Sequence, residues 1–139
     1  MKKYKLERTD FTTPNKRPLF RVVALRDFLD VKKGDKGGLV ESESNLSQDG
    51  SCWVYYNARV YDDASVWDNA RVYDGARISG NASVAGNSWV GGHTRLTGGT
   101  ALTTKHYSWD IAEVENGDGT TTLYGNATFE PATGERREL

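Results

Sequence analysis

The sequence predicts an all-β fold that repeats a short strand and a corner every six residues, and three observations indicate it. An aliphatic residue recurs at every sixth position from Val54 to Leu102 without a slip. A small residue stands two positions before each of these, from Cys52 to Thr100, and the positions between are rich in Asn, Asp, Gly and aromatic residues. A period of six suits a short strand followed by a corner. It fits neither the 3.6-residue period of a helix nor the 2-residue period of a half-buried strand.

The corners of such a coil need residues that tolerate a left-handed backbone. One column of the repeat consists mainly of Asn and Gly, which adopt positive φ at low cost. Its members are Asn57, Asn69, Gly75, Asn81, Asn87 and Gly99, together with Asp63 and His93. We therefore expect the corners at this column.

Eight consecutive hexapeptides, from VYYNAR at residues 54–59 to LTGGTA at residues 96–101, resemble the hexapeptide-repeat proteins. Members of that family form a left-handed parallel β-helix in which three hexapeptides make one triangular coil, so the resemblance implies a short β-helix of about three coils. The resemblance implies three inward columns, Val54, Val72, Val90; Val60, Ile78, Leu96; and Val66, Val84, Leu102. The left hand follows from the resemblance alone, because parallel crossovers in general are right-handed.

The segment before the repeats strengthens the resemblance. It contains Asp27-Phe28, Asp30-Val31-Lys32, Gly37-Gly38, Leu46-Ser47-Gln48, Gly50 and Cys52-Trp53. This pattern is similar to the entry segment of YdcK-like hexapeptide-repeat proteins of bacteria and phages. With the repeats, the similarity covers about residues 19–102; it implies a fold and assigns no reaction.

The patterns divide one structural domain into three parts: an N-terminal cap over 1–39, the hexapeptide β-helix over 40–102, and a C-terminal hairpin with a tail over 103–139. In the cap, residues 19–29 predict a strand, with a helix as the rival interpretation. The glycines at 34, 37 and 38 predict a sharp turn into the first coil rather than a phosphate-binding loop. Val40 and Leu46 are six apart, and an insertion of two residues is expected around residues 48–51.

The C-terminal part predicts a β-hairpin around the sequence NGDG at residues 116–119. In it, Trp109, Ile111 and Val114 are expected to face Thr122, Leu123 and Tyr124. Leu123 and Phe129 are again six apart, so a last hexapeptide could rejoin the stack. The polar end after residue 130 is expected to be frayed.

Composition narrows the possible functions. The net charge is −1, although residues 1–38 sum to +6, residues 39–102 to −3 and residues 103–139 to −4. Such a charge balance gives no global argument for nucleic-acid binding, and nucleic-acid contact through the basic N-terminal segment is the weakest hypothesis.

The one cysteine, Cys52, occupies a small-residue position and is expected to be buried. No long apolar run or signal peptide is seen, so we expect no membrane contact and a cytoplasmic protein of cellular or phage origin.

The outward aromatic residues are the first candidate binding site. They are Trp53, Tyr55, Tyr61, Trp67 and Tyr73, and Tyr55 and Tyr73 should lie one above the other. Exposed aromatic rings are typical of interfaces. Cover by the cap or the hairpin is the alternative, and both remain open. The leading interface is a homo-oligomer, a dimer or a trimer.

Charged residues of the repeat are the second candidate. Arg59 and Arg77 are expected one coil apart, where they could hold a small anion or pair with a neighbouring Asp. The four aspartates, Asp62, Asp63, Asp68 and Asp74, are expected to form turns rather than a cation site. We expect no metal ion and no cofactor.

The two histidines, His93 and His106, support an enzymatic alternative. Many hexapeptide-repeat enzymes are trimeric acyltransferases with a histidine general base between subunits, and a histidine can activate a hydroxyl or an amine. The chain lacks the long inserted loop and extra coils that usually hold the acyl carrier. The first expectation is therefore a non-enzymatic assembly or binding module. It would act through its aromatic faces on a host protein or on a small ligand at a subunit junction.

Overall fold

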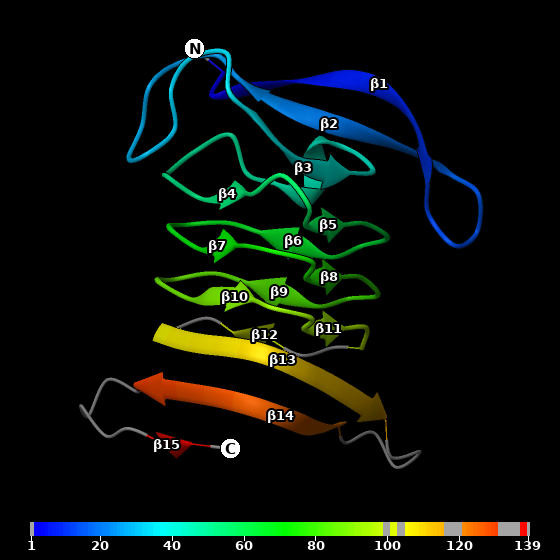
Figure 1. Ribbon diagram of the computed structural model, residues 1–139, viewed down its shortest axis with the longest axis vertical. Helices are drawn as coiled ribbons and strands as arrows, with labels where there is room; N and C mark the ends of the chain where they lie inside the picture. Colours follow the sequence, from blue (N-terminus) through cyan, green and yellow to red (C-terminus); the bar gives the residue numbers. More distant parts are fainter. Residues whose placement is uncertain (1, 99–100, 103–104, 116–120, 131–136, 139) are drawn as a thin grey trace.

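The chain forms a β-solenoid of about three stacked parallel coils (Figure 1). The structure is a computed structural model that describes residues 2–98, 101–102, 105–115, 121–130 and 137–138. Among these residues the only helical segment is a 3₁₀ turn, η1 (Glu43–Asn45). No described helix is long and apolar enough to span a membrane. The left hand of the coil stays a prediction from the resemblance.

The solenoid is built from short strands on three faces. They are β4 (Trp53–Val54), β7 (Arg71–Val72) and β10 (Trp89–Gly91); β5 (Arg59–Val60), β8 (Arg77–Ile78) and β11 (Arg95–Leu96); and β6 (Ser65–Val66), β9 (Ser83–Val84) and β12 (Ala101–Leu102). Each strand pairs in parallel with the strand one coil on, and the predicted columns are in register, for example Val60 with Ile78 and Ile78 with Leu96. All nine aliphatic residues are buried. The three-column prediction is confirmed.

Small residues line the coil where the prediction placed them. Seven of them, from Ala58 to Thr94, are at most 1% exposed, and so is Cys52 at the start of the column. A larger side chain there would collide with the neighbouring coil, because interiors are close-packed. Thr100 lies outside the described residues.

The expected column lies in the turns, as predicted, but the left-handed backbone was predicted one residue too late. Positive φ occurs at Asp62, Asp68, Asp74, Gly80, Gly86 and Gly92, one position before the expected Asn and Gly column. The reason is a hydrogen bond between coils. Asp62 Oδ2 accepts from the amide of Gly80 at 3.1 Å, and the same bond recurs at the other two pairs of this set. Each aspartate bends the backbone and also fastens it to the corner eighteen residues on.

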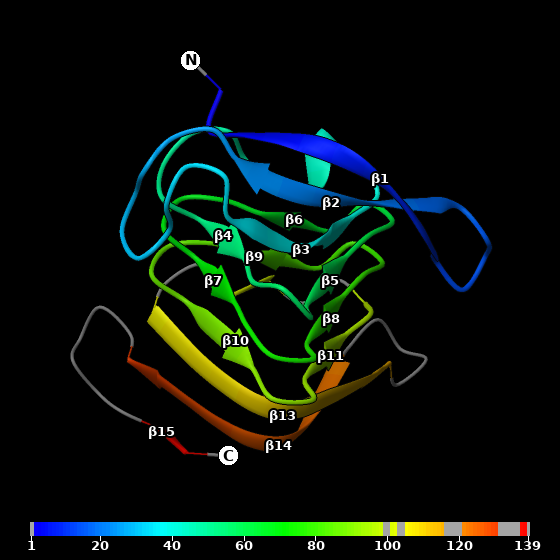
Figure 2. The same cartoon turned by 45° about the horizontal axis from the view of Figure 1, so that its top comes forward.

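The N-terminal cap is a three-stranded antiparallel meander of β1 (Tyr4–Thr12), β2 (Pro18–Ala24) and β3 (Lys36–Val40). The strand interpretation of residues 19–29 is thus confirmed as far as Ala24, and the helix is excluded. β3 pairs in parallel with β5, so the cap and the solenoid share one sheet. Figure 2 shows β1 and β2 lying across the N-terminal end of the solenoid. Leu46 pairs with Val66, two residues beyond the regular step, as the expected insertion requires.

Gly37 and Gly38 form part of strand β3 and not a turn, which corrects the prediction. Their role is close approach. A Cβ on Gly37 would lie 2.5 Å from the carbonyl oxygen of Val54, and one on Gly38 would lie 2.4 Å from that of Tyr55. Only glycine lets β3 pack this tightly on the first coil.

The C-terminal hairpin is confirmed. β13 (Lys105–Glu115) pairs antiparallel with β14 (Thr121–Glu130), and β13 also pairs in parallel with β10 and β11. Val114 lies opposite Thr122 as expected, whereas Trp109 lies opposite Asn126. The turn at 116–119 lies outside the described residues.

Two further C-terminal predictions were wrong. Residues 123–129 do not rejoin the stack as a hexapeptide, because they continue one long strand held by β13. The end is not wholly frayed, because β15 (Arg137–Glu138) pairs with β14. In both cases antiparallel pairing with the adjacent strand orders the backbone.

Candidate functional site

The three faces of the solenoid differ in chemistry. The first outward residue of each strand pairs in register with its equivalent in the next coil. These residues are Trp53, Arg71 and Trp89 on the first face, Arg59, Arg77 and Arg95 on the second, and Ser65, Ser83 and Ala101 on the third. We call these the aromatic face (β4, β7, β10), the arginine face (β3, β5, β8, β11) and the small-residue face (β6, β9, β12).

The aromatic face contains a continuous group of rings. Tyr55 stacks on Tyr73 with ring centroids 4.6 Å apart and planes inclined by 19°, which confirms the predicted arrangement. Tyr73 in turn meets Trp89 edge to face at 6.1 Å. The guanidinium of Arg71 lies 5.5 Å from the centre of the Trp89 ring. Trp89 is 38% exposed and Tyr73 is partly exposed, so this group faces outward.

Tyr55 anchors the upper end of this group. Its hydroxyl donates to Asp30 Oδ1 at 2.8 Å. Burial raises the pKa of Tyr55, and the hydrogen bond to Asp30 adds to the rise. The hydroxyl therefore stays a neutral donor, and the loop before β3 is fixed beside the aromatic face.

Two of the aromatic candidates are covered by the cap. Trp53 is 2% exposed and packs edge to face on Phe28, with ring centroids 5.2 Å apart. Tyr61 is buried against Leu19 and Leu39. Of the two alternatives left open by the sequence, cover by the cap therefore applies to these two rings, because both lie in the first coil, which the N-terminal strands cover.

Trp67 is separated from the other candidates. It is 41% exposed and belongs to the small-residue face. Its neighbour one coil on, Ala85, is buried and has no ring to extend the surface. The structure thus brings Tyr55 and Tyr73 together and leaves Trp67 alone.

The arginine face contains the predicted basic column. Arg59 pairs in register with Arg77, and Arg77 with Arg95. Arg95 was not among the predicted residues, although its position thirty-six residues after Arg59 follows from the same period. The exposed ring of Phe11 covers the first member, with its centre 5.1 Å from the Arg59 guanidinium. Burial lowers the pKa of Arg59, and Arg77 lowers it further.

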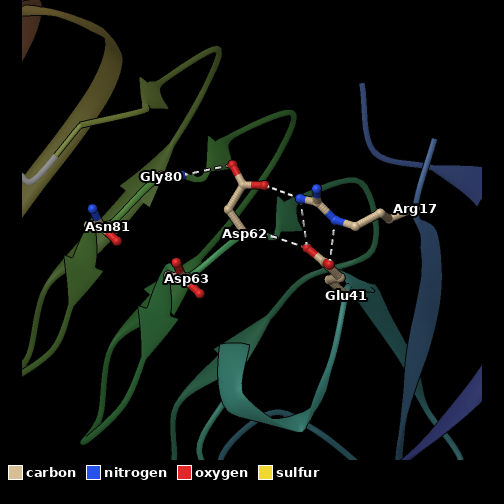
Figure 3. A pocket seen from close by; sticks show the side chains of 6 residues that line it. All are labelled: Arg17, Glu41, Asp62, Asp63, Gly80 and Asn81. Atoms are coloured by element: carbon tan, nitrogen blue, oxygen red, sulfur yellow. Dashed lines mark hydrogen bonds and ion pairs between the residues drawn. The ribbon is translucent and has the colours of Figure 1, made fainter. Parts of the chain in front are cut away.

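A polar pocket of about 410 Å³ opens at the corner between the arginine face and the small-residue face (Figure 3). Its lining consists of Arg17, Glu41, Asp62, Asp63, Gly80 and Asn81. Arg17 Nε donates to Glu41 Oε2 at 2.6 Å, and Arg17 Nη2 donates to Asp62 Oδ1. Glu41 Oε1 also accepts from the backbone amide of Asp62 at 2.8 Å. These contacts fasten the β1–β2 turn to the first coil.

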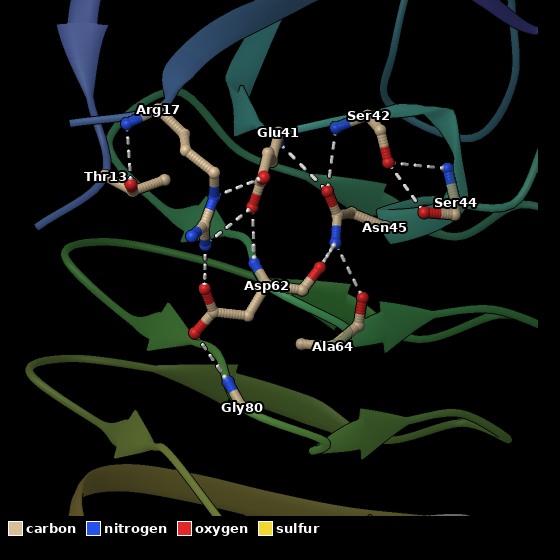
Figure 4. A network of polar contacts seen from close by, with 9 residues as sticks. All are labelled: Thr13, Arg17, Glu41, Ser42, Ser44, Asn45, Asp62, Ala64 and Gly80. Carbon is tan, nitrogen blue, oxygen red and sulfur yellow. Dashed lines mark hydrogen bonds and ion pairs between the residues drawn. The ribbon is translucent and has the colours of Figure 1, made fainter. Parts of the chain in front are cut away.

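Asn45 completes this network from the 3₁₀ turn (Figure 4). Its amide oxygen accepts from the backbone nitrogens of Glu41 and Ser42 at 3.0 and 2.8 Å. Its amide nitrogen donates to the carbonyl of Ala64 at 2.8 Å. Arg17 and the backbone amides satisfy the two carboxylates, and backbone groups alone satisfy the Asn45 amide, so the network explains the entry of the chain into the solenoid without a ligand. Within the described ranges no group of three or more His, Cys, Asp or Glu could hold a metal ion.

The two histidines belong to different elements. His93 is exposed at the corner before β11, where its Nδ1 lies 3.7 Å from the site of a Cβ on Gly75, and it does not line the pocket. The backbone of His106 lies in β13 opposite Phe129.

Sequence reasoning missed a buried lysine beside the buried cysteine. Lys3 is fully buried, and its Nζ donates to the carbonyl oxygen of Cys52 at 2.7 Å and lies 3.2 Å from its Sγ. Burial lowers the pKa of Lys3 and raises the pKa of Cys52. No sequence pattern indicates this pair, because Lys3 is forty-nine residues away in a segment with several other lysines.

Comparison with known proteins gives one partial match. Over 37 residues the chain is 43% identical to a protein of Escherichia coli (strain K12) named "Uncharacterized acetyltransferase YdcK". The match covers 27% of this chain and 11% of that protein. No family model matches the sequence. The β-solenoid and this partial match together fit the hexapeptide-repeat β-helix proteins.

Proposed function

We propose that this chain is a non-enzymatic assembly module that binds a second copy of itself through its aromatic face. The observation that supports the proposal best is the group formed by Tyr55, Tyr73 and Trp89, in which Trp89 is 38% exposed and both tyrosines are partly exposed. Aromatic side chains and Arg are enriched in protein interfaces, and rings that already pack on one another lose little conformational freedom on binding.

The charges of the aromatic face suit a contact between identical surfaces. Arg71 lies in the middle of the face, and the exposed Asp30 lies beside its upper end next to Tyr55. A self-complementary interface places each residue of one copy near a different residue of the other. Two copies could therefore set the cation of one against the carboxylate of its neighbour. Contact between identical surfaces closes as a dimer.

The molecular mass in solution tests this proposal. Sedimentation should give a dimer for the wild-type chain and a monomer for Trp89→Ser, which removes the outermost ring. Trp67→Ser is a matched control, since Trp67 has a similar exposure of 41% on another face and should leave the oligomer intact. A monomeric wild type, or equal dissociation of both variants, would contradict the proposal.

A small acyltransferase is the second candidate, favoured by the partial match to the Escherichia coli protein named as an acetyltransferase. His93 or His106 would serve as its general base. Calorimetric binding of acetyl-coenzyme A that is lost in His93→Ala or His106→Ala would support this alternative. No heat of binding would argue against it.

A further inference from the structure

The arginine face has one guanidinium in each coil. Arg59, Arg77 and Arg95 come from neighbouring parallel strands in register. Neighbouring strands lie about 4.8 Å apart, so the three backbone positions span roughly 10 Å. The two flanking faces have mixed or uncharged residues at the equivalent positions. Positive charge is therefore concentrated on the arginine face of the solenoid.

These three cations have no carboxylate partner among the side chains that the structure describes, which belong to residues 2–98 and 101–102. The ion pairs found there join Lys2 to Glu43, Lys36 to Glu7, and Arg17 to Glu41 and Asp62. Like charges directly opposite each other on neighbouring strands are destabilising. Burial, Arg77 and Arg21 together lower the pKa of Arg59, which shows that the cations act on one another. An anion bound across the column would relieve this repulsion.

We propose that Arg59, Arg77 and Arg95 form a binding site for the oligophosphate group of a small molecule. The planar guanidinium donates two parallel hydrogen bonds to a phosphate, which a lysine cannot do. Each phosphate of a short oligophosphate can contact the arginine of a different coil. Because the site extends over only three coils, it suits a compact ligand. The net charge of −1 gives the chain little general attraction for a nucleic-acid polymer. This site lies on a different face from the proposed assembly surface.

Calorimetry with inorganic triphosphate at low ionic strength tests the proposal. Triphosphate should bind more tightly than orthophosphate, because it can contact the arginines of more than one coil. Arg77→Gln removes the central guanidinium and should weaken triphosphate binding by about tenfold or more. Arg77→Lys keeps the charge but loses the paired donors, so its affinity for triphosphate should lie between those of the wild type and Arg77→Gln. Arg8→Gln removes the same charge from an exposed position on β1 and should change the affinity by less than about twofold.

Thermal unfolding gives a second measurement on the same proteins. Triphosphate should raise the melting temperature of the wild type and of Arg8→Gln, but not that of Arg77→Gln. Trp89→Ser should retain triphosphate binding, which separates this site from the assembly surface. The proposal is overturned if wild-type protein does not bind triphosphate, or if Arg77→Gln and Arg8→Gln lose equal affinity. Tighter, Arg77-dependent binding of a single-stranded DNA oligonucleotide would overturn it in favour of a nucleic-acid site.

Discussion

Replacing Gly80 by alanine should destabilise the solenoid far more than the same change at Gly75, five residues earlier in the same coil. Gly80 has φ +63°, and a Cβ there would lie 2.0 Å from the carbonyl oxygen of Thr97 in the next coil. A left-handed backbone costs an L-residue about 1–2 kcal/mol, and relieving the overlap with a backbone atom costs about 1–3 kcal/mol more. We therefore expect Gly80→Ala to lower the free energy of unfolding by about 2–5 kcal/mol.

Gly75 provides the matched control. Its φ is not positive, and the nearest atom to an added Cβ is the carbonyl oxygen of Gly92 at 3.6 Å, an ordinary contact. Gly75→Ala should be neutral or stabilise by about 0.4–1 kcal/mol, because it restricts the unfolded chain. Urea unfolding followed by tryptophan fluorescence measures both variants. Equal midpoints for the two would refute the assignment of the corner to the Gly80 column.

Three other changes test the core, the aromatic face and the cap. Ile78→Ala should cost about 2–5 kcal/mol in urea unfolding, since the side chain is fully buried, whereas Ser83→Ala on the small-residue face should cost less than about 1 kcal/mol. Burial raises the pKa of Tyr55, so its contribution to stability is present below the unfolded-state value of about 10 and is lost as the pH rises above it. Tyr55→Phe should thus make unfolding free energy less dependent on pH above about pH 10, and an unchanged slope would contradict this. Arg17→Ala should speed hydrogen exchange at the β1–β2 turn, most directly at the amide of Thr13, and exchange at wild-type rates would show that the ion pairs do not fasten the turn.

The inner architecture could be predicted from the sequence because the six-residue period specifies it directly. Every aliphatic position, such as Val66 or Leu96, belongs to a strand whose partner is eighteen residues away. A shift of one residue in the strand register would turn a column of apolar side chains toward solvent. Burial therefore fixes the register strongly, as in any sheet with one apolar face.

The corner and the covered aromatics could not be predicted in the same way. Asn and Asp both tolerate a left-handed backbone, so residue type alone did not distinguish Asp62 from Asp63. The deciding contact is the bond from Gly80 to Asp62 between coils. Likewise Trp53 and Tyr55 have similar sequence surroundings, but only Trp53 lies under Phe28, which comes from a distant part of the cap.

The outward positions give the strongest argument that the faces have different roles. The aliphatic residue of each hexapeptide supplies the core, so the fold places little demand on the residue before it, except at Trp53, which packs under the cap. Tryptophan, arginine and serine all occupy that position in the same solenoid, for example Trp89, Arg77 and Ser83. If these residues were selected for stability alone, Trp, Arg and Ser would be distributed over all three faces. They are instead sorted with a period of eighteen, apart from Arg71 within the aromatic face. This sorting is expected when one face contacts another protein copy and a second contacts an anion.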